Sequence, residues 1–567
     1  MPYMEQDKNL AAELHKEEAS ETAFSPVTFD EFTPPSYEEW KQEVATALKG
    51  GSFEKSMFTK TYEGITLNPI YRLEDQEKIT HNKTYPGMES NLRGANAGGY
   101  IHKVWTIAQE CDGKTPAEAN EMVKYELLKG TTAASVALDT ATRKGCDPDK
   151  AEEKDVADIG VSLATAADVE KLLDGVDLEK FEIDIYAGAS NIALLAAVAA
   201  ACDKKSLPLT KLHGAITADP IGELALDGAL VRPLDEYYDE MAHSIAWAEK
   251  NAPQLRTVVV NTDVYHNGGA NDIQEVAYAM NEAVTYMRAM ERRGIDINAF
   301  CRHLRFHFSI GANFFMEIAK LRAARMVYAQ IAEAYGASEA ARKLHVFART
   351  SAFTKTVYDP YVNILRTTTE AFSGVVGGVD AMEVAPLDEP FGSSEELTRR
   401  IARNIQVMMQ EEFHLTQPVD PAGGSWYVET LTAQLAESIW AYFQNIESKG
   451  GIESAILSGA LQDDVAATLA QRFKNLDTRT DRAVGVNMYA NVLEQKLDRP
   501  AAKAVPAPAG PAVITAKPIE AHRWTERYEA LRAKTEAWME KTGKTLDVFL
   551  ANMGPIPQHK ARADFAA

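Results

Sequence analysis

The sequence predicts an α/β protein built on a (β/α)8 TIM-type barrel, and residues 256–325 show the pattern most clearly. The β-branched run Arg256–Thr262 has the composition of a buried strand, and an apolar helical pattern begins at Ile273. A second strand candidate, His303–Ser309, leads into a second helical pattern. Strand, loop and helix repeated in this order give a parallel sheet with helices outside it, and barrel enzymes carry their chemistry on the loops after the strands.

Six more short apolar runs recur along the chain, separated mostly by helical patterns. These strand candidates are Ala133–Asp139, Asp158–Ala164, Phe181–Ala187, His213–Thr217, Lys343–Arg349 and Ala381–Leu387. Together the eight candidates span roughly 255 residues, which is the usual size of a (β/α)8 barrel. An open parallel sheet of six to eight strands fits the same pattern.

The segments outside the barrel pattern divide the chain further. We expect an N-terminal arm over residues 1–85, the barrel over 86–430, a helical extension over 431–498, an Ala/Pro-rich linker over 499–515 and a final segment over 516–567. In the arm, Ser36 is expected to cap a helix that ends by Gly50, with Glu39 completing a capping box. In the final segment we expect a linker helix and then Thr545–Pro555 as the first strand of a further α/β domain, incomplete at Ala567.

The composition narrows the classes of function. The net charge of −23 over 567 residues argues against a nucleic-acid-binding surface, because such a surface needs clustered Lys and Arg. No apolar run approaches the ~20 residues of a membrane span, and the charged N-terminus lacks the apolar core of a secretory signal. The four cysteines (Cys111, Cys146, Cys202 and Cys301) form no CxxC pair, so we predict no metal site and no disulfides and expect a cytoplasmic protein.

Seven motifs occur in one order along roughly residues 36–500. They are Trp105–Glu110, Ser135–Asp149, Val264–Ala270, Ile310–Arg325, Asp359–Gly374, Arg400–Asn404 and Val419–Thr430. Together they resemble the methylmalonyl-CoA mutase family. The resemblance implies a barrel threaded by acyl-CoA and capped by a flavodoxin-like cobalamin domain, of which residues 516–567 would be the truncated beginning. It also implies the radical isomerisation of (R)-methylmalonyl-CoA and succinyl-CoA with adenosylcobalamin, which carries the radical chemistry while the protein positions and shields it.

Several ligand positions of the family's catalytic chains differ here. Ala108 and Glu110 stand where WTIRQY-like motifs have an Arg and a Tyr, and Asp227 corresponds to the Arg that holds the substrate carboxylate. A carboxylate at that position repels a carboxylate substrate. An Arg that contacts CoA corresponds to His303, and a HSQTSG-like segment becomes Phe347–Ala352. The cobalamin-ligand motif D-x-H-x-x-G does not occur in the sequence.

Two residues keep the type that the family has. The resemblance assigns His266 as a catalytic residue and Glu389 as a cofactor-binding residue, although the neighbours of His266 become Gly268 and Gly269. The residues alone favour a packed polar side chain for His266, and a tight turn rather than an anion cradle for the glycine pair. Four alternating residues are expected to fill the barrel interior: His303, Phe306, His307 and Phe308.

These differences favour the non-catalytic small subunit of a heterodimeric mutase, with a large catalytic subunit as its partner. The complex would hold adenosylcobalamin and acyl-CoA, whereas this chain alone would not bind the cofactor. The alternative, which His266 favours, is a catalytic acyl-CoA mutase barrel of altered acyl specificity with its cobalamin domain supplied separately. Aromatic residues of the arm are expected to pack on the partner; they are Phe29, Phe32, Tyr37, Trp40 and Tyr71.

Overall fold

The computed structural model describes residues 30, 32–491, 494, 497, 499, 511–546 and 549–566. The chain divides into two compact units, Met1–Thr61 with Thr66–Pro69, and Tyr62–Ile65 with Ile70–Ala567. Phe29 of the predicted arm and residues 500–510 of the predicted linker lie outside the described residues. No helix within the described ranges has both the length and the apolar character that crossing a membrane would require.

One capped helix organises the first unit. Helix α2 (Tyr37–Ala47) begins after Ser36, whose hydroxyl accepts a hydrogen bond from Glu39 N, while the Glu39 carboxylate accepts one from Ser36 N at 2.7 Å. The predicted capping box is therefore confirmed. Helix α3 (Phe53–Met57) and the antiparallel pair β1 (Thr59–Lys60) and β2 (Thr66–Leu67) follow. Ring contacts within this unit join Tyr37 to Trp40, Trp40 to Phe53 and Phe53 to Phe58.

Eight parallel strands form the centre of the second unit. They are β3 (Thr106–Ala108), β4 (Ala133–Val136), β5 (Glu182–Tyr186), β6 (His213–Ala218), β8 (Gln254–Asn261), β9 (Leu304–Ile310), β10 (Val346–Thr350) and β11 (Ala381–Glu383). Their spatial order is β3-β11-β10-β9-β8-β6-β5-β4. The two ends of this order also meet, because Thr132 N donates to Ile107 O at 2.9 Å and Cys111 N to Ser135 O at 3.1 Å. The sheet is thus a nearly closed barrel, which agrees with the predicted TIM-type fold.

One of the eight predicted strands is wrong. Asp158–Ala164 contributes a single bridge, between Leu138 and Val161, and no strand. A Cβ on Gly160 would lie less than 3.0 Å from Ala137 O, so this segment crosses close over the end of β4 instead of extending the sheet. The true eighth strand is β3, which has three residues and lies inside the motif Trp105–Glu110, where the polar residues Gln109 and Glu110 follow it directly.

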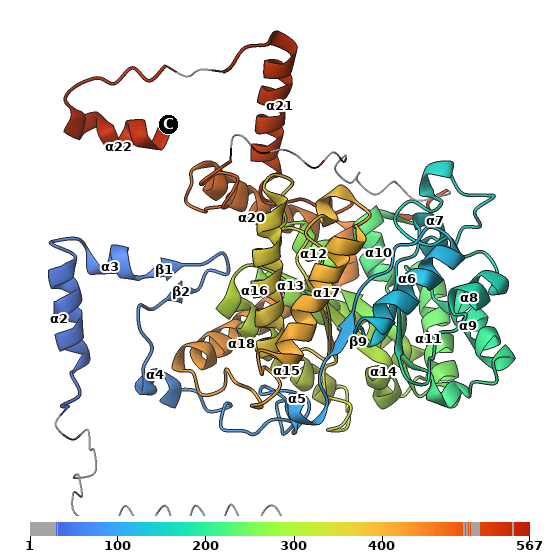
Figure 1. Cartoon of the computed structure of the whole chain (residues 1–567). Helices are drawn as coiled ribbons and strands as arrows, with labels where there is room; N and C mark the ends of the chain where they lie inside the picture. Colours follow the sequence, from blue (N-terminus) through green and yellow to red (C-terminus); the bar gives the residue numbers. More distant parts are fainter. Residues whose placement is uncertain are drawn as a thin grey trace, which may run out of the picture. The chain divides into compact units, whose positions relative to one another are not determined.

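Helices cover the outside of the barrel (Figure 1). On one side lie α6 (Pro116–Leu128), α8 (Ala166–Leu172), α9 (Ile192–Lys204) and α11 (Leu234–Asn251). On the other lie α13 (Asp272–Arg292), α15 (Phe314–Ala334), α16 (Asn363–Gly377), α17 (Glu396–Glu411) and α18 (Trp426–Glu447). Shorter helices include α4 (Leu73–Glu77), α10 (Pro220–Asp227), α12 (Asp263–Asn267) and α14 (Ile297–His303).

The interior of the barrel differs from the prediction for β9. Phe306 and Phe308 point into the helix layer, where the Phe306 ring lies 5.2 Å from that of Tyr328 on α15. Arg305 and His307, on the opposite face of the strand, line the interior instead. The prediction placed Phe306, His307 and Phe308 together in the interior, but successive side chains of a strand face opposite sides, so only His307 of the three lines the cavity.

The C-terminal part returns to the barrel. Helix α20 (Ala460–Asp477) is followed by β12 (Ile514–Thr515), which lies at the end of the predicted linker 499–515 and pairs antiparallel with β7 (Ala229–Leu230). Helices α21 (Glu526–Thr542) and α22 (Ile556–Ala566) come next. The described residues between them contain no strand, so the expected first strand of a cobalamin-type domain is not shown; a lone strand without a pairing partner has nothing to stabilise it.

Candidate functional site

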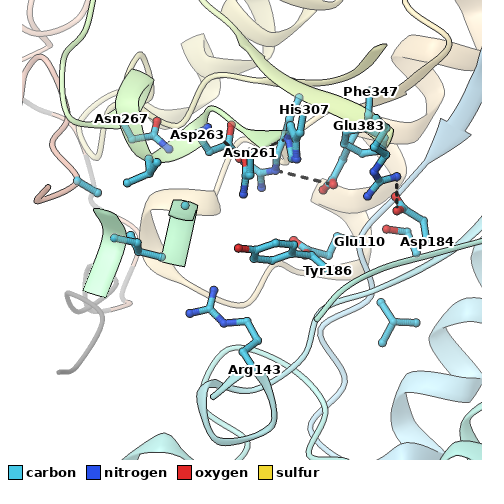
Figure 2. Close-up of a pocket in the computed structure, with 18 of the residues that line it drawn as sticks. Glu110, Arg143, Asp184, Tyr186, Asn261, Asp263, Asn267, His307, Phe347 and Glu383 are labelled. Atoms are coloured by element: carbon cyan, nitrogen blue, oxygen red, sulfur yellow. Dashed lines mark hydrogen bonds and ion pairs between the residues drawn. The ribbon is translucent and has the colours of Figure 1, made fainter. Parts of the chain in front are cut away.

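A cavity of about 280 Å³ lies at the carboxyl ends of the barrel strands. Its charged and polar lining comes from seven different strands or the loops that follow them (Figure 2). The lining includes Glu110, Arg143, Asp184, Tyr186, Asn261, Asp263, Arg305, His307, Arg349 and Glu383. This is the end of the barrel at which the sequence predicted a site.

The cationic groups deep in the cavity are paired with carboxylates of the same chain. Arg305 Nη1 lies 2.6 Å from Asp184 Oδ1, and its guanidinium lies over the Phe347 ring at 4.7 Å. Arg349 Nη1 lies 2.5 Å from Glu389 Oε1, and its Nε lies 3.8 Å from Glu383 Oε2. A ligand anion would have to displace these carboxylates to reach either arginine.

Burial also shifts the pKa values of three side chains that line the cavity. Burial raises the pKa of Glu383 to about 8, although the neighbouring Arg349 acts to lower it. Burial likewise raises the pKa of Glu110, and it lowers the pKa of the His307 imidazole. All three changes favour the neutral form, as expected for groups removed from water.

The predicted catalytic residue, His266, lies in a buried hydrogen-bond network on α12. Its Nε2 lies 2.7 Å from Ser351 Oγ and its Nδ1 3.3 Å from Glu275 Oε2. Glu275 in turn pairs with Lys320 at 3.0 Å; burial acts to raise the pKa of Glu275, but Lys320 and His266 lower it to about 2. His266 is only 7% exposed and is not among the residues that line the cavity. Its catalytic assignment stays a prediction.

The predicted cofactor-binding residue, Glu389, lies at the start of the short 3-10 helix Glu389–Phe391 after β11. It lines a second hollow next to the cavity and shares Arg349 with it. The ion pair to Arg349 fixes one carboxylate oxygen of Glu389. Among the described residues, no group of three or more His, Cys, Asp or Glu side chains is arranged to hold a metal ion.

Of the other positions inferred from the resemblance, Glu110 and Phe347 line the cavity, whereas Asp227, Ala108 and His303 do not. Asp227 ends α10, and burial, with Glu223 adding to it, raises the pKa of Asp227 to about 6. Ala108 is buried in β3 and offers no polar group. His303 lies at the opposite end of the barrel, where its Nδ1 lies 2.5 Å from Leu255 O and its Nε2 lies 2.8 Å from Glu249 Oε1. Arg305, two residues further on, is the cation of β9 that reaches the cavity.

A segment that the sequence did not predict crosses part of the open end of the barrel. We call Val513–Thr525 the strap. Its hydrogen bonds to the barrel run from Val513 N to Leu230 O at 2.8 Å, from Ile519 N to Ala225 O at 2.8 Å, from His522 N to Asn267 O at 2.8 Å, and from Trp524 Nε1 to Thr354 O at 3.1 Å. These acceptors follow β6, β8 and β10, so the strap bridges three loops. Ile519 and Ala521 form part of the cavity wall.

The glycine pair beside His266 allows the strap and helix α20 to pack close to this loop. A Cβ on Gly268 would lie less than 3.0 Å from Ile519 Cγ2 of the strap, and a Cβ on Gly269 would lie 2.8 Å from Leu469 Cβ on α20. Gly269 also has φ +103°, which favours glycine. Apolar side chains therefore fill the space beside the pair. An anion-binding loop would need that space to be open.

Arg143 was not predicted as a site residue. It follows β4 and points toward the cavity from the side opposite Asp184 and Glu383 (Figure 2). Its Nε and Nη2 atoms are buried without a hydrogen-bond partner among the described residues. The motif Ser135–Asp149 contains it, but only its loop geometry reveals that it reaches the cavity.

The fold and the site define a TIM-type barrel protein in which residues 513–525 cross three of the loops at the carboxyl end of the barrel. Comparison with known proteins identifies the family: the methylmalonyl-CoA mutase model matches residues 60–539, and the chain belongs to that family. A methylmalonyl-CoA mutase small subunit from Streptomyces virginiae is 32% identical over 545 residues, which cover 95% of this chain and 82% of that protein. The small subunit from Porphyromonas gingivalis is 31% identical over 548 residues, with the same coverage. The Streptomyces virginiae large subunit is 31% identical over 465 residues, covering 82% of this chain and 63% of that protein.

Proposed function

We propose that this chain is the non-catalytic small subunit of a heterodimeric, adenosylcobalamin-dependent methylmalonyl-CoA mutase. The observation that carries the proposal is the strap: Ile519 fills the space beside Gly268 and walls the cavity at the carboxyl ends of the strands. The likeness to two small subunits over 95% of the chain supports the same conclusion.

The residues present do not fit the family's ligands. The cavity of about 280 Å³ lies at the lower limit of pockets for drug-sized molecules, about 300–1,000 Å³, and an acyl-CoA is larger than these. Asp227 replaces the expected cation for the substrate carboxylate, and Arg305 and Arg349 are already paired with carboxylates. The motif D-x-H-x-x-G, whose histidine would bind the cobalt of adenosylcobalamin, does not occur in these 567 residues. We therefore assign the chemistry to the partner and derive no catalytic step for this chain.

The alternative proposal, a catalytic acyl-CoA mutase barrel of altered specificity, rests on His266. Its hydrogen bonds to Ser351 and Glu275 would fix the orientation of the imidazole, as a catalytic histidine requires. Its exclusion from the cavity lining supports the structural assignment instead.

Co-expression with the catalytic mutase chain that carries WTIRQY and D-x-H-x-x-G tests the proposal. We expect light scattering to show a 1:1 complex, and an absorbance titration to show adenosylcobalamin bound by the complex but not by this chain alone. Stoichiometric micromolar binding of the cofactor by the isolated chain, or the absence of any complex, would contradict it.

A further inference from the structure

Helix α16 presents a face to solvent that has no charge. Its exposed residues, with the exposed residue just before it, are Tyr361, Leu365, Thr369 and Phe372. They recur at intervals of three and four, so they form one stripe along the helix. Arg366 is turned away from this stripe, because its Nη1 lies 2.8 Å from Asn363 Oδ1 and its Nη2 lies 2.7 Å from Val484 O. A solvent-facing helix normally carries charges on this side.

Aromatic contacts extend the stripe over three neighbouring helices. The ring of Phe372 lies 5.2 Å from that of Phe314, at the start of α15. Further contacts join Phe314 to Phe315, Phe315 to Tyr427 on α18, and Tyr427 to Tyr71, next to α4. We call the exposed residues of this surface the α16 face: Phe315, Tyr361, Leu365, Thr369 and Phe372.

The α16 face is large enough to form the centre of a protein interface. Its apolar members Phe315, Tyr361, Leu365 and Phe372 are 46%, 65%, 67% and 38% exposed. At ~150–250 Å² for each large side chain, they expose roughly 400 Å² of apolar surface. One partner contributes about 800 Å² to a standard stable interface, of which the apolar centre is the larger part.

Charge indicates which kind of partner this face admits. The chain carries a net charge of −23, so its surface as a whole repels other acidic molecules. At an uncharged stripe another acidic protein can bind with less electrostatic repulsion. The absence of Lys and Arg from the stripe disfavours nucleic acid and anionic membranes, which both need cations. An apolar, aromatic centre without charge is typical of permanent protein–protein interfaces.

We propose that the α16 face is the docking site for the large mutase chain. The proposal rests on the function proposed above and adds the surface that makes the contact. Tyr361, Leu365 and Phe372 would be buried at the centre of the interface, and the ring contact between Phe372 and Phe314 joins this stripe to α15.

Two substitutions place a charge on this face without disturbing the core. Leu365→Glu and Thr369→Arg each alter an exposed residue of α16. Leu128→Glu is the matched control, since Leu128 ends α6 and is 78% exposed. The Kd for the catalytic mutase chain is measured by biolayer interferometry, and the melting temperature of each isolated variant is recorded. We expect Leu365→Glu and Thr369→Arg to raise the Kd at least about tenfold, and Leu128→Glu to leave it unchanged.

The possible outcomes separate the two proposals. A wild-type complex that both α16 variants form at full strength would overturn the docking site and leave the partnership standing. No complex with the wild-type chain would overturn the proposed function itself. A lower melting temperature for both α16 variants in isolation would show that the chain covers this face itself, and loss of a homodimer would show that a second copy does; either result overturns the docking site.

Discussion

Ile519 Cγ2 lies less than 3.0 Å from the position that a Cβ on Gly268 would take, so Ile519 and any larger residue at 268 exclude each other. A second glycine, Gly228, has the same relation to the strap, because its Cβ would lie 2.8 Å from Ala516 O. Two loops of the barrel are thus shaped to receive one segment that lies about 250 to 290 residues further along the chain. This fit places Ile519 and Ala521 in the lining of the cavity and holds the strap against the barrel.

Gly268→Ala should loosen the strap. The added methyl group needs the space of Ile519, and overpacking of this kind costs about 1–3 kcal/mol of the free energy of unfolding. Urea denaturation measures the loss, and hydrogen exchange should become faster over residues 513–525. The double variant Gly268→Ala/Ile519→Ala is the control: it should be more stable than the sum of the two single effects predicts. Strict additivity would show that the two residues do not compete for the same space.

Arg305→Met should destabilise the barrel strongly. Removing the guanidinium leaves Asp184 buried without its partner, which costs about 3–5 kcal/mol for a buried ion pair. Thermal and urea unfolding of the isolated chain measure the effect. In Arg305→Met/Asp184→Leu both charges are gone, so most of the stability should return. If the double variant is no more stable than the single one, packing on Phe347, and not the charge pair, dominates at this position.

Glu383 should make stability depend on pH. Its pKa in the folded chain is about 8, above the ~4.3 of an unfolded glutamate, so the folded state binds the extra proton between these values. The stabilising contribution is complete below about pH 4.3 and is lost as the pH rises toward 8. Glu383→Gln removes this titration. The free energy of unfolding of the variant, relative to that of the wild-type chain, should therefore rise by up to about 1.4 kcal/mol per pH unit over that range. Urea unfolding at pH 5, 6, 7 and 8 checks it, and a constant difference would be contrary to this account.

Asp227→Arg alone should not create an acyl-CoA site. The substitution supplies a cation for the substrate carboxylate, but Ala108 and the strap are unchanged, and groups that bind a ligand as a set are not restored one at a time. Calorimetry with succinyl-CoA should give no saturable heat for the wild-type chain or for this variant. Saturable binding by the variant would show that the cavity is open and that only its charge had changed.

The longest strands of the barrel could be predicted best from the sequence. The runs that became β8 and β9 were predicted within two residues at each end, since strands of eight and seven residues that contain several β-branched or aromatic side chains give a clear pattern. Strand β3 has three residues and gave no such pattern. The predicted strand at Asp158–Ala164 failed because its apolar residues pack across the end of β4, which residue pattern alone does not distinguish from pairing in the sheet.

The site was predicted less completely than the fold. The family motifs led to His266 and Glu389, but the contacts that shape the cavity join residues far apart in sequence, such as Arg305 with Asp184 and Ile519 with Gly268. No local pattern in residues 513–525 indicates that they return to the barrel. The one signal available was the glycine pair itself, since glycine permits close approach of another segment as well as a tight turn.

The most direct test of the account is mutase turnover by this chain with and without its partner. Adenosylcobalamin and (R)-methylmalonyl-CoA are supplied to the isolated chain, to the catalytic mutase chain mixed with it, and to a buffer control, and succinyl-CoA is measured by chromatography. We predict no succinyl-CoA above the control from the isolated chain, and turnover from the 1:1 complex. Turnover by the isolated chain that disappears in His266→Asn would contradict the account and establish this barrel as a catalytic one.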